Sequence, residues 1–214
     1  MEKEYWLERW EHRQIGFDQQ HPNPLLVRHF SKLNISRNGK IFVPLTGKTI
    51  DVAWLLSQGF EVTGCELSEQ AVRELFGMLD IEAAIEPWEY GKIYTSERLT
   101  LFVGDFFSLI KTDLGTVDGV YDRAALVALP SEARHLYTSY LRLITQQAPQ
   151  LLIVFDYDQE LISGPPFSIS KEEITNHYAE EYHIALIEKK DIPGGLKGVA
   201  PATEDVWLVR SKPC

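Results

Sequence analysis

The chain has 214 residues, of which 44% are hydrophobic and 24% charged, and it carries a formal net charge of −10. The length predicts one domain over residues 1–214, and the composition excludes disordered, collagen-like and coiled-coil proteins. The acidic balance argues against a nucleic-acid-binding face and against binding to anionic membrane surfaces.

The cysteine content and the hydropathy pattern bear on the cellular compartment. Cys65 and Cys214 are the two cysteines of the chain, too few for a disulfide framework, which favours a reducing environment. No run approaches the ~18 apolar residues of a membrane-spanning helix. The charged N-terminus MEKEYWLERWEHRQ is not a secretory signal. We therefore expect a cytoplasmic protein, monomeric by default.

The first half of the chain alternates between strand-like and helical patterns. Residues 40–45 (KIFVPL) form an apolar, strand-sized run, and residues 50–58 have helical spacing with Gly59 at the position where helices end. A second strand is predicted at 60–67, followed by a helix with Ser68 as its N-cap. This order predicts a parallel sheet with right-handed crossovers.

The pattern resumes after an irregular stretch at 81–97. Further strands are predicted at 99–103, 117–121 and 150–157, the last an uninterrupted apolar run typical of a strand buried on both faces. Helices are predicted at 131–147 and 170–178, and two late strands, 183–189 and 205–210, are expected to pair antiparallel at the sheet edge. The fold class is therefore α/β, with about seven strands in the core (40–214) and a helical N-terminal extension (1–35).

Ligands of open α/β sheets bind outside the carboxyl ends of the strands. Gly47 follows the first predicted strand and Glu66 ends the second, 19 residues later, close to the ~20 expected between a phosphate-turn glycine and a ribose-binding acid. The first turn matches neither G-x-G-x-x-G nor a P-loop, since Phe42 stands where the P-loop glycine would be. This pattern favours a nucleoside ligand without pyrophosphate, such as S-adenosylmethionine. The alternative is an ordinary turn and a solvated acid.

Other strand ends carry further candidates, each with a structural alternative. Asp105 could accept a hydrogen bond from an adenine amino group, with Phe106 beside the ring, or it could cap a helix. Arg123 could clamp a carboxylate, or form a surface ion pair with Asp122. Before the first strand, Trp6 and Trp10 share a helix face, so they form either core packing or a lid over the ligand. No metal-binding signature and no serine-hydrolase motif occur.

Longer motifs follow in a fixed order between residues 6 and 170. They are tryptophans 6 and 10 with IGFDQ (15–19), VPLTGKTIDVAWL (43–55), GFEVTGCELSEQAV (59–72), GDFF (104–107), YDRAALVALP (121–130) and YDQELISGPPFSIS (157–170). In this combination the chain resembles the thiopurine S-methyltransferase family, in its bacterial form. The resemblance implies a class I S-adenosylmethionine-dependent methyltransferase fold, a mostly parallel seven-stranded sheet with helices on both faces, and a helical N-terminal lid.

The resemblance also implies a function and site residues. The expected reaction is methyl transfer from S-adenosylmethionine to the sulfur of thiopurines or other aromatic or heterocyclic thiols, with selenium or tellurium compounds as further acceptors. Arg123 and Asp18 are the catalytic candidates, although no residue need act as a base. The expected cofactor-binding residues are Trp10, Leu45, Glu66 (ribose), Asp105, Phe106 (adenine) and Arg123 (methionine end), and the expected substrate-binding residues are Phe17, Arg123 and Lys197.

Two other functions remain open from the residues alone. The α/β sheet would also suit a nicotinamide-dependent oxidoreductase, but this chain lacks the G-x-G-x-x-G glycines expected of that class. A non-catalytic nucleoside-binding protein would keep the fold and the ribose-binding acid without the reaction.

Overall fold

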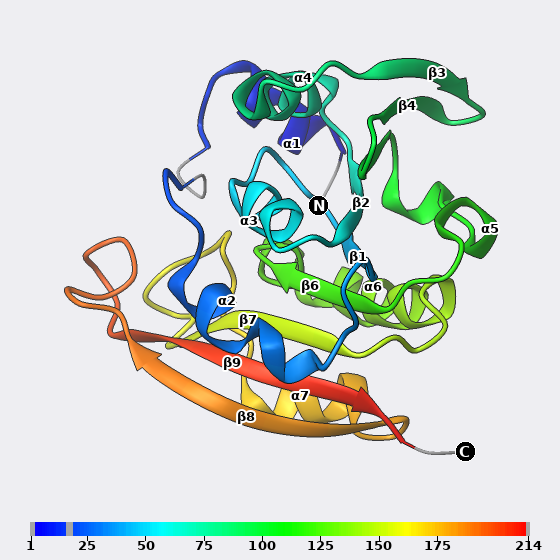
Figure 1. The fold of residues 1–214 in the computed structure, drawn as a ribbon. Helices are drawn as coiled ribbons and strands as arrows, with labels where there is room; N and C mark the ends of the chain where they lie inside the picture. The colour runs from blue at the N-terminus through cyan, green and yellow to red at the C-terminus, as the bar shows by residue number, and fades with distance from the viewer. Residues whose placement is uncertain (1–2, 16–18, 213–214) are drawn as a thin grey trace.

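The computed structural model describes residues 3–15 and 19–212 (Figure 1). Within these ranges one sheet has nine strands, in the order β3-β4-β5-β2-β1-β6-β7-β9-β8. Its five central strands run parallel to one another, which confirms the predicted parallel sheet. These strands are β5 (Leu99–Val103), β2 (Glu61–Glu66), β1 (Lys40–Val43), β6 (Gly119–Arg123) and β7 (Gln150–Tyr157).

The predicted antiparallel pair at one edge is confirmed. It consists of β8 (Tyr182–Asp191) and β9 (Ala202–Ser211), with β9 also antiparallel to β7 and β8 outermost. At the opposite edge lies a hairpin that the sequence did not predict, so the expected count of seven strands is corrected to nine. The hairpin consists of β3 (Ala84–Trp88) and β4 (Gly91–Thr95).

The hairpin was missed because it has no buried apolar run. Four of the five residues of β3 are exposed, and Pro87 interrupts the strand pattern. A proline is compatible with an edge strand, where one backbone N–H can be missing. Gly91 starts β4 so close to β5 that a side chain there would collide with the Val103 carbonyl.

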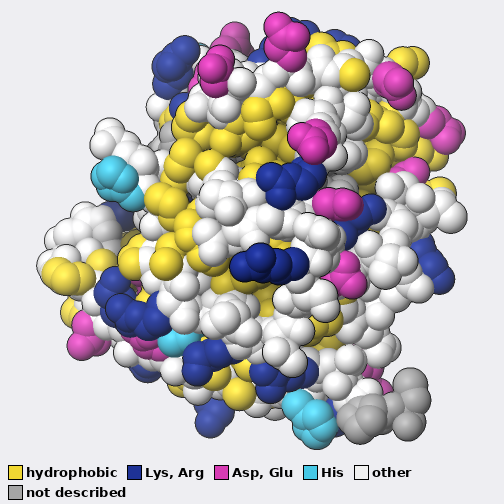
Figure 2. Space-filling model, viewed as in Figure 1, with side chains coloured by type: hydrophobic (Ala, Val, Ile, Leu, Met, Phe, Trp, Pro, Cys, Tyr) yellow, Lys and Arg dark blue, Asp and Glu magenta, His cyan; other side chains and the backbone are white. Residues whose placement is uncertain are grey.

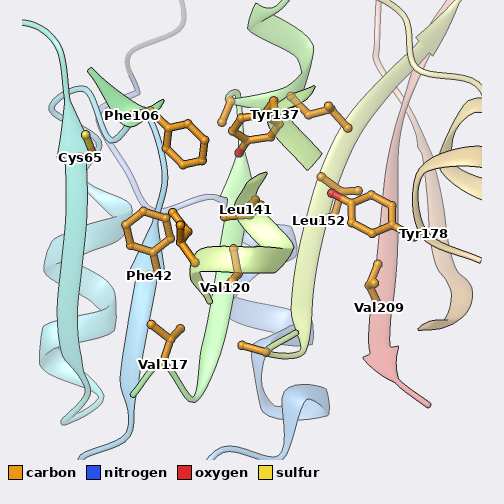
Figure 3. Packing of buried hydrophobic residues seen from close by; sticks show 14 of the residues in the cluster. Phe42, Cys65, Phe106, Val117, Val120, Tyr137, Leu141, Leu152, Tyr178 and Val209 are labelled. Carbon is orange, nitrogen blue, oxygen red and sulfur yellow. The ribbon is translucent and has the colours of Figure 1, made fainter. Parts of the chain in front are cut away.

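Helices cover both faces of the sheet and bury two hydrophobic clusters. In β1, Ile41 and Val43 belong to one cluster and Phe42 to the other, as expected for a strand buried on both sides. Figure 3 shows the Phe42 side, with Phe106 above it and Leu141 of a covering helix nearby. The helices are α2 (Pro24–His29), α3 (Asp51–Ser57) and α4 (Glu69–Leu79) on one face, and α5 (Lys111–Leu114), α6 (Ser131–Ile144) and α7 (Lys171–Tyr178) on the other. Three short 3-10 turns are η1 (Phe30–Leu33), η2 (Phe106–Ser108) and η3 (Leu126–Ala128).

The N-terminal extension divides into two parts with different surroundings. Helix α1 (Lys3–Glu11) lies at the same end of the molecule as α4 in Figure 1, and Arg13, two residues after it, lies 3.8 Å from the Glu74 carboxylate of α4. Helix α2 instead packs on the sheet through the fully buried Leu25 and Leu26. Its Arg28 guanidinium lies 2.6 Å from the Glu188 carboxylate of β8. None of the helices in the described ranges is long and apolar enough to cross a membrane.

Candidate active site

A cavity of about 690 Å³ lies at the carboxyl ends of the parallel strands, within the roughly 300–1,000 Å³ typical of small-molecule sites. Its walls come from the loops after β1, β2, β5, β6 and β7, from α1 and from the β8–β9 loop. The structure therefore brings together all the predicted site residues that it describes. These are Trp10, Leu45, Glu66, Asp105, Phe106, Arg123 and Lys197. Phe17 and Asp18 lie outside the described residues.

Glu66, the last residue of β2, is the most constrained group of the cavity. Its side chain is 6% exposed, so the alternative of a solvated acid is wrong. One carboxylate oxygen accepts the Gly47 N–H at 2.7 Å and the other accepts the Ser68 N–H at 2.8 Å. Burial raises the pKa of Glu66, while these backbone hydrogen bonds oppose the rise. Each carboxylate oxygen keeps further lone-pair capacity, so a pair of ligand hydroxyls can donate to the same group.

The turn after β1 folds back over β2 to reach this carboxylate. Gly47 has a φ of +57°, and Leu45 has a φ of +44°, a left-handed conformation that costs a non-glycine residue roughly 1–2 kcal/mol. The Thr46 N–H donates to the Cys65 carbonyl at 2.9 Å. The close approach requires a glycine on β2, because a Cβ at Gly64 would collide with the Thr46 hydroxyl. Strain of this kind concentrates at functional sites.

Asp105 follows β5 and has two partners within the protein. One carboxylate oxygen caps η2 by accepting the Phe107 N–H at 3.0 Å, so Asp105 does cap a helix, a role that leaves further accepting capacity on the carboxylate. The other lies 2.7 Å from the Lys3 ammonium of α1, and this hydrogen bond raises the pKa of Lys3. Phe106 is 4% exposed and packs against Tyr137, with ring centres 5.0 Å apart. Asp105 therefore joins α1 to the cavity wall, and Phe106 links that wall to the core.

Asp122 and Arg123 end β6 but do not form the surface ion pair considered above. Asp122 is fully buried, and its carboxylate accepts the Tyr137 hydroxyl at 2.7 Å and the Leu126 N–H at 3.2 Å. Burial raises the pKa of Asp122 to about 6. Arg123 is half-buried and lines the cavity, followed by Ala124 with a φ of +71°. Asp122 thus fixes the turn that carries Arg123.

The cavity lining is positive although the chain as a whole is acidic. On the face seen in Figure 2, acidic and basic side chains are interspersed. In the cavity, by contrast, cations outnumber anions among the described lining residues. They are Lys3, Arg9, Lys48, Arg123 and Lys197, against Glu66 and Asp105. An anionic group on a ligand is therefore favoured at this site over the surrounding surface.

One wall of the cavity was not predicted from the sequence. It is built by residues 127–129, by Phe155 of β7 and by Pro165 and Pro166 in the loop after β7. The rule that ligands bind at the carboxyl ends of strands could have indicated the proline pair, because its loop follows the strongest predicted strand. Tyr137 of α6 also lines the cavity, but the sequence does not indicate this, since its position within a helical pattern suggests only packing.

Solved methyltransferases have the same fold. A 1,6-didemethyltoxoflavin-N1-methyltransferase from Burkholderia thailandensis, solved with bound 1,6-didemethyltoxoflavin and S-adenosylhomocysteine, superposes with a TM-score of 0.67 at 15% identity, covering 98% of this chain and 87% of that one. An S-adenosylmethionine-dependent methyltransferase from Anabaena variabilis gives 0.63 at 15% identity, covering 98% and 95%. These likenesses confirm the class I methyltransferase fold.

The sequence comparisons identify the family. The model of the thiopurine S-methyltransferase family matches residues 1–212. A thiopurine S-methyltransferase of Xanthobacter autotrophicus is 46% identical over 210 residues, covering 98% of this chain and 99% of the relative. One of Teredinibacter turnerae is 46% identical over 207 residues, covering 97% and 96%. The chain belongs to the thiopurine S-methyltransferase family, which confirms the expected enzyme class, an S-adenosylmethionine-dependent methyltransferase.

The buried Asp122 predicts a pH-dependent stability difference. Its pKa of about 6 in the folded protein lies above the ~3.9 of an unfolded aspartate, so the folded state binds more protons between these values. Its contribution to the free energy of unfolding therefore falls by about 3 kcal/mol as the pH rises from about 4 to above 6. Asp122→Asn lacks this loss, so its stability relative to the wild type should improve over that range. Urea unfolding of both proteins at pH 4, 5, 6 and 7 measures the difference, and a difference independent of pH contradicts the assignment.

Proposed function

We propose that this protein transfers the methyl group of S-adenosylmethionine to the sulfur of thiopurines and other small aromatic or heterocyclic thiols. The observation that carries the proposal is the buried Glu66 carboxylate, held by two backbone N–H groups in a positively lined cavity at the carboxyl ends of the strands. The family supports the same reaction and does not favour a nicotinamide-dependent oxidoreductase or a non-catalytic binding protein.

The residues after β1, β2 and β5 suit the nucleoside part of the donor. Glu66 would accept hydrogen bonds from the ribose hydroxyls, and Leu45 would contact the donor from the first turn. Asp105 and Phe106 would hold the adenine, since both line the cavity just after β5. When bound, S-adenosylmethionine supplies a methyl group that its positively charged sulfur has already activated.

Helix α1 is proposed to act as the lid over this site. Trp6, Arg9 and Trp10 line the cavity from α1, and Trp10 is 4% exposed. The ion pair between Lys3 and Asp105 ties the first residue of the helix to the cavity wall. A closed lid would exclude water from the reacting groups, which strengthens the electrostatic interactions inside the site.

The acceptor is proposed to bind as an anion near the methionine end of the donor. Thiolate is the reactive form of sulfur, and the cationic side chains of Arg123 and Lys197 line the cavity. Lys197 also donates to the Pro165 carbonyl at 2.9 Å, which places its ammonium group at the proline wall. Under this proposal the protein supplies mainly orientation, worth up to about 7–11 kcal/mol in well-aligned reactions. Phe17 remains a proposed contact of the acceptor ring, and Asp18 remains a candidate for the acceptor side.

We further propose that selenium and tellurium compounds are alternative acceptors, because their anionic forms match the charge of the cavity. A monomeric state and a cytoplasmic location complete the proposal, on the basis of the acidic, cysteine-poor composition.

The acceptor class is tested by assaying the purified protein with S-adenosylmethionine and 6-mercaptopurine, thiophenol or selenite. We expect S-methylated products from both thiols, identified by mass spectrometry. Because binding of a thiolate matches the positive lining, the initial rate should also rise as the pH passes the pKa of each thiol. Absence of S-methylated product from every aromatic thiol would refute the proposed acceptor class.

The donor site is tested by Glu66→Gln. The variant loses the charge and one accepting oxygen, and a hydrogen bond to a charged group is worth roughly 1.5–3 kcal/mol. Affinities for S-adenosylmethionine and S-adenosylhomocysteine should therefore both fall about 10- to 100-fold, as measured by titration calorimetry. The matched control is Glu61→Gln, at the exposed opposite end of β2, which should bind like the wild type. A folded Glu66→Gln variant with unchanged affinity would place the nucleoside elsewhere.

A further inference from the structure

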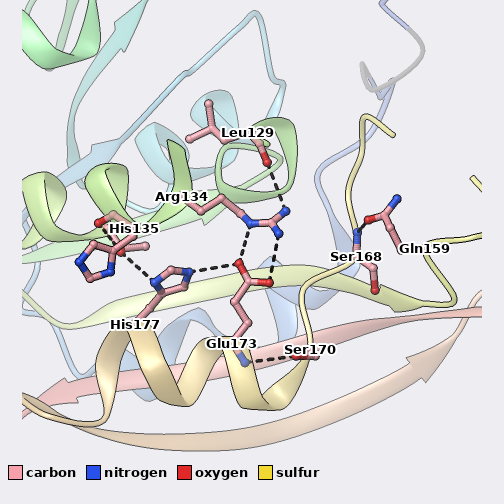
Figure 4. A network of polar contacts seen from close by, with 9 residues as sticks. Leu129, Arg134, His135, Gln159, Ser168, Ser170, Glu173 and His177 are labelled. Carbon is pink, nitrogen blue, oxygen red and sulfur yellow. Dashed lines mark hydrogen bonds and ion pairs between the residues drawn. The ribbon is translucent and has the colours of Figure 1, made fainter. Parts of the chain in front are cut away.

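A largely buried ion-pair cluster joins α6 to α7 (Figure 4). The Arg134 guanidinium approaches both carboxylate oxygens of Glu173, at 2.5 and 3.2 Å, and its side chain is only 8% exposed. His177 contacts the same carboxylate at 3.2 Å. Burial raises the pKa of Glu173, but His177 and Arg134 outweigh this and hold the pKa below its usual value. The cluster is thus a charged, geometrically fixed support, since a two-point arginine–carboxylate contact restricts orientation.

The same guanidinium also contacts two segments of the cavity wall. It donates to the Leu129 carbonyl at 3.3 Å, and its centre lies 5.8 Å from the centre of the Phe167 ring, within range of a cation–π interaction. The Phe167 N–H in turn donates to the Val127 carbonyl at 2.7 Å. Val127 and Leu129 line the cavity, as does Pro166, the residue before Phe167. Arg134 itself is not part of the lining, so it acts on the cavity only through these segments.

The two segments belong to one half of the cavity. They follow β6 and β7, whereas the proposed nucleoside contacts follow β1, β2 and β5. Because the strand order is β5-β2-β1-β6-β7, these sets occupy opposite sides of the β1–β6 boundary. The ion-pair cluster therefore supports the half of the cavity that the nucleoside leaves open.

We propose that Arg134 is a positioning residue for the acceptor, which fixes the spacing between residues 127–129 and 165–167 and so the shape of the acceptor half. This inference rests on the proposed methyl transfer to a small thiol. A lysine at the position keeps the charge, but its single ammonium group cannot contact Glu173 at two points while also reaching the Leu129 carbonyl and the Phe167 ring. Loss of the two-point guanidinium contact should therefore loosen residues 127–129 and 165–167 without removing the positive charge.

The test compares Arg134→Lys with Arg142→Lys in the full chain. Arg142 lies on the same helix and also bridges to α7, donating to the His177 carbonyl at 3.0 Å, but among the described residues its hydrogen bonds and ion pairs reach no lining residue. For each protein, the KM for 6-mercaptopurine is measured at saturating donor, and the dissociation constant for S-adenosylhomocysteine by calorimetry. We expect Arg134→Lys to raise the acceptor KM about tenfold, a size consistent with misplacement from outside the site. Its donor affinity should stay within twofold, and Arg142→Lys should change neither value.

Three results would overturn the inference. They are an unchanged acceptor KM in Arg134→Lys, an equal loss of donor affinity, and the same KM increase in Arg142→Lys, which would indicate general loosening of the α6–α7 contact. If Arg134→Lys does not fold, Glu173→Gln replaces it, because it keeps the shape but removes the charge that holds the guanidinium, and the same KM increase is expected. Failure of the proposed function is separate, since it appears as absence of S-methylation by the wild type.

Discussion

The carboxylate of Glu66 is the constraint on which the geometry of the site depends. By accepting the N–H groups of Gly47 and Ser68, it joins the turn after β1, the end of β2 and the start of α4 at one point. Burial of this charge is unfavourable, as the raised pKa of the group shows, and the two backbone hydrogen bonds offset part of that cost. The carboxylate is therefore fixed in place before any ligand binds, which reduces the ordering that binding requires.

Unfavourable backbone conformations occur at the same edge of the sheet, and the strands that precede them are well packed. Leu45, two residues after β1, and Ala124, directly after β6, adopt left-handed backbone conformations. The five parallel strands below them are packed on both faces by helices, so the unfavourable turns rest on a well-packed base. The buried contact between Asp122 and Tyr137 continues this pattern, because it holds the turn that carries Arg123 without reaching the surface.

The parallel core and the strand-end residues could be predicted from the sequence because both leave strong patterns. Buried strands such as β7 read as uninterrupted apolar runs, and Glu66 stands at a fixed distance from Gly47. The β3–β4 hairpin left no such pattern, since β3 is exposed and contains a proline. The ion-pair cluster next to the acceptor half could not be predicted from the sequence either, because contacts such as that between Arg134 and Glu173 join residues 39 positions apart. Burial of Asp122 could not be predicted either, because its partner Tyr137 lies 15 positions later in the chain, on α6.

The central claim is that the carboxyl edge of the sheet divides into a nucleoside half and an acceptor half, with Glu66 at the ribose. A crystal structure of the protein with S-adenosylhomocysteine tests this most directly. The account predicts both ribose hydroxyls within hydrogen-bond distance of the Glu66 carboxylate, the adenine beside Asp105 and Phe106, and the proline wall left open for the acceptor. A nucleoside bound against Pro165 and Lys197, or a Glu66 carboxylate without ligand contact, would contradict it.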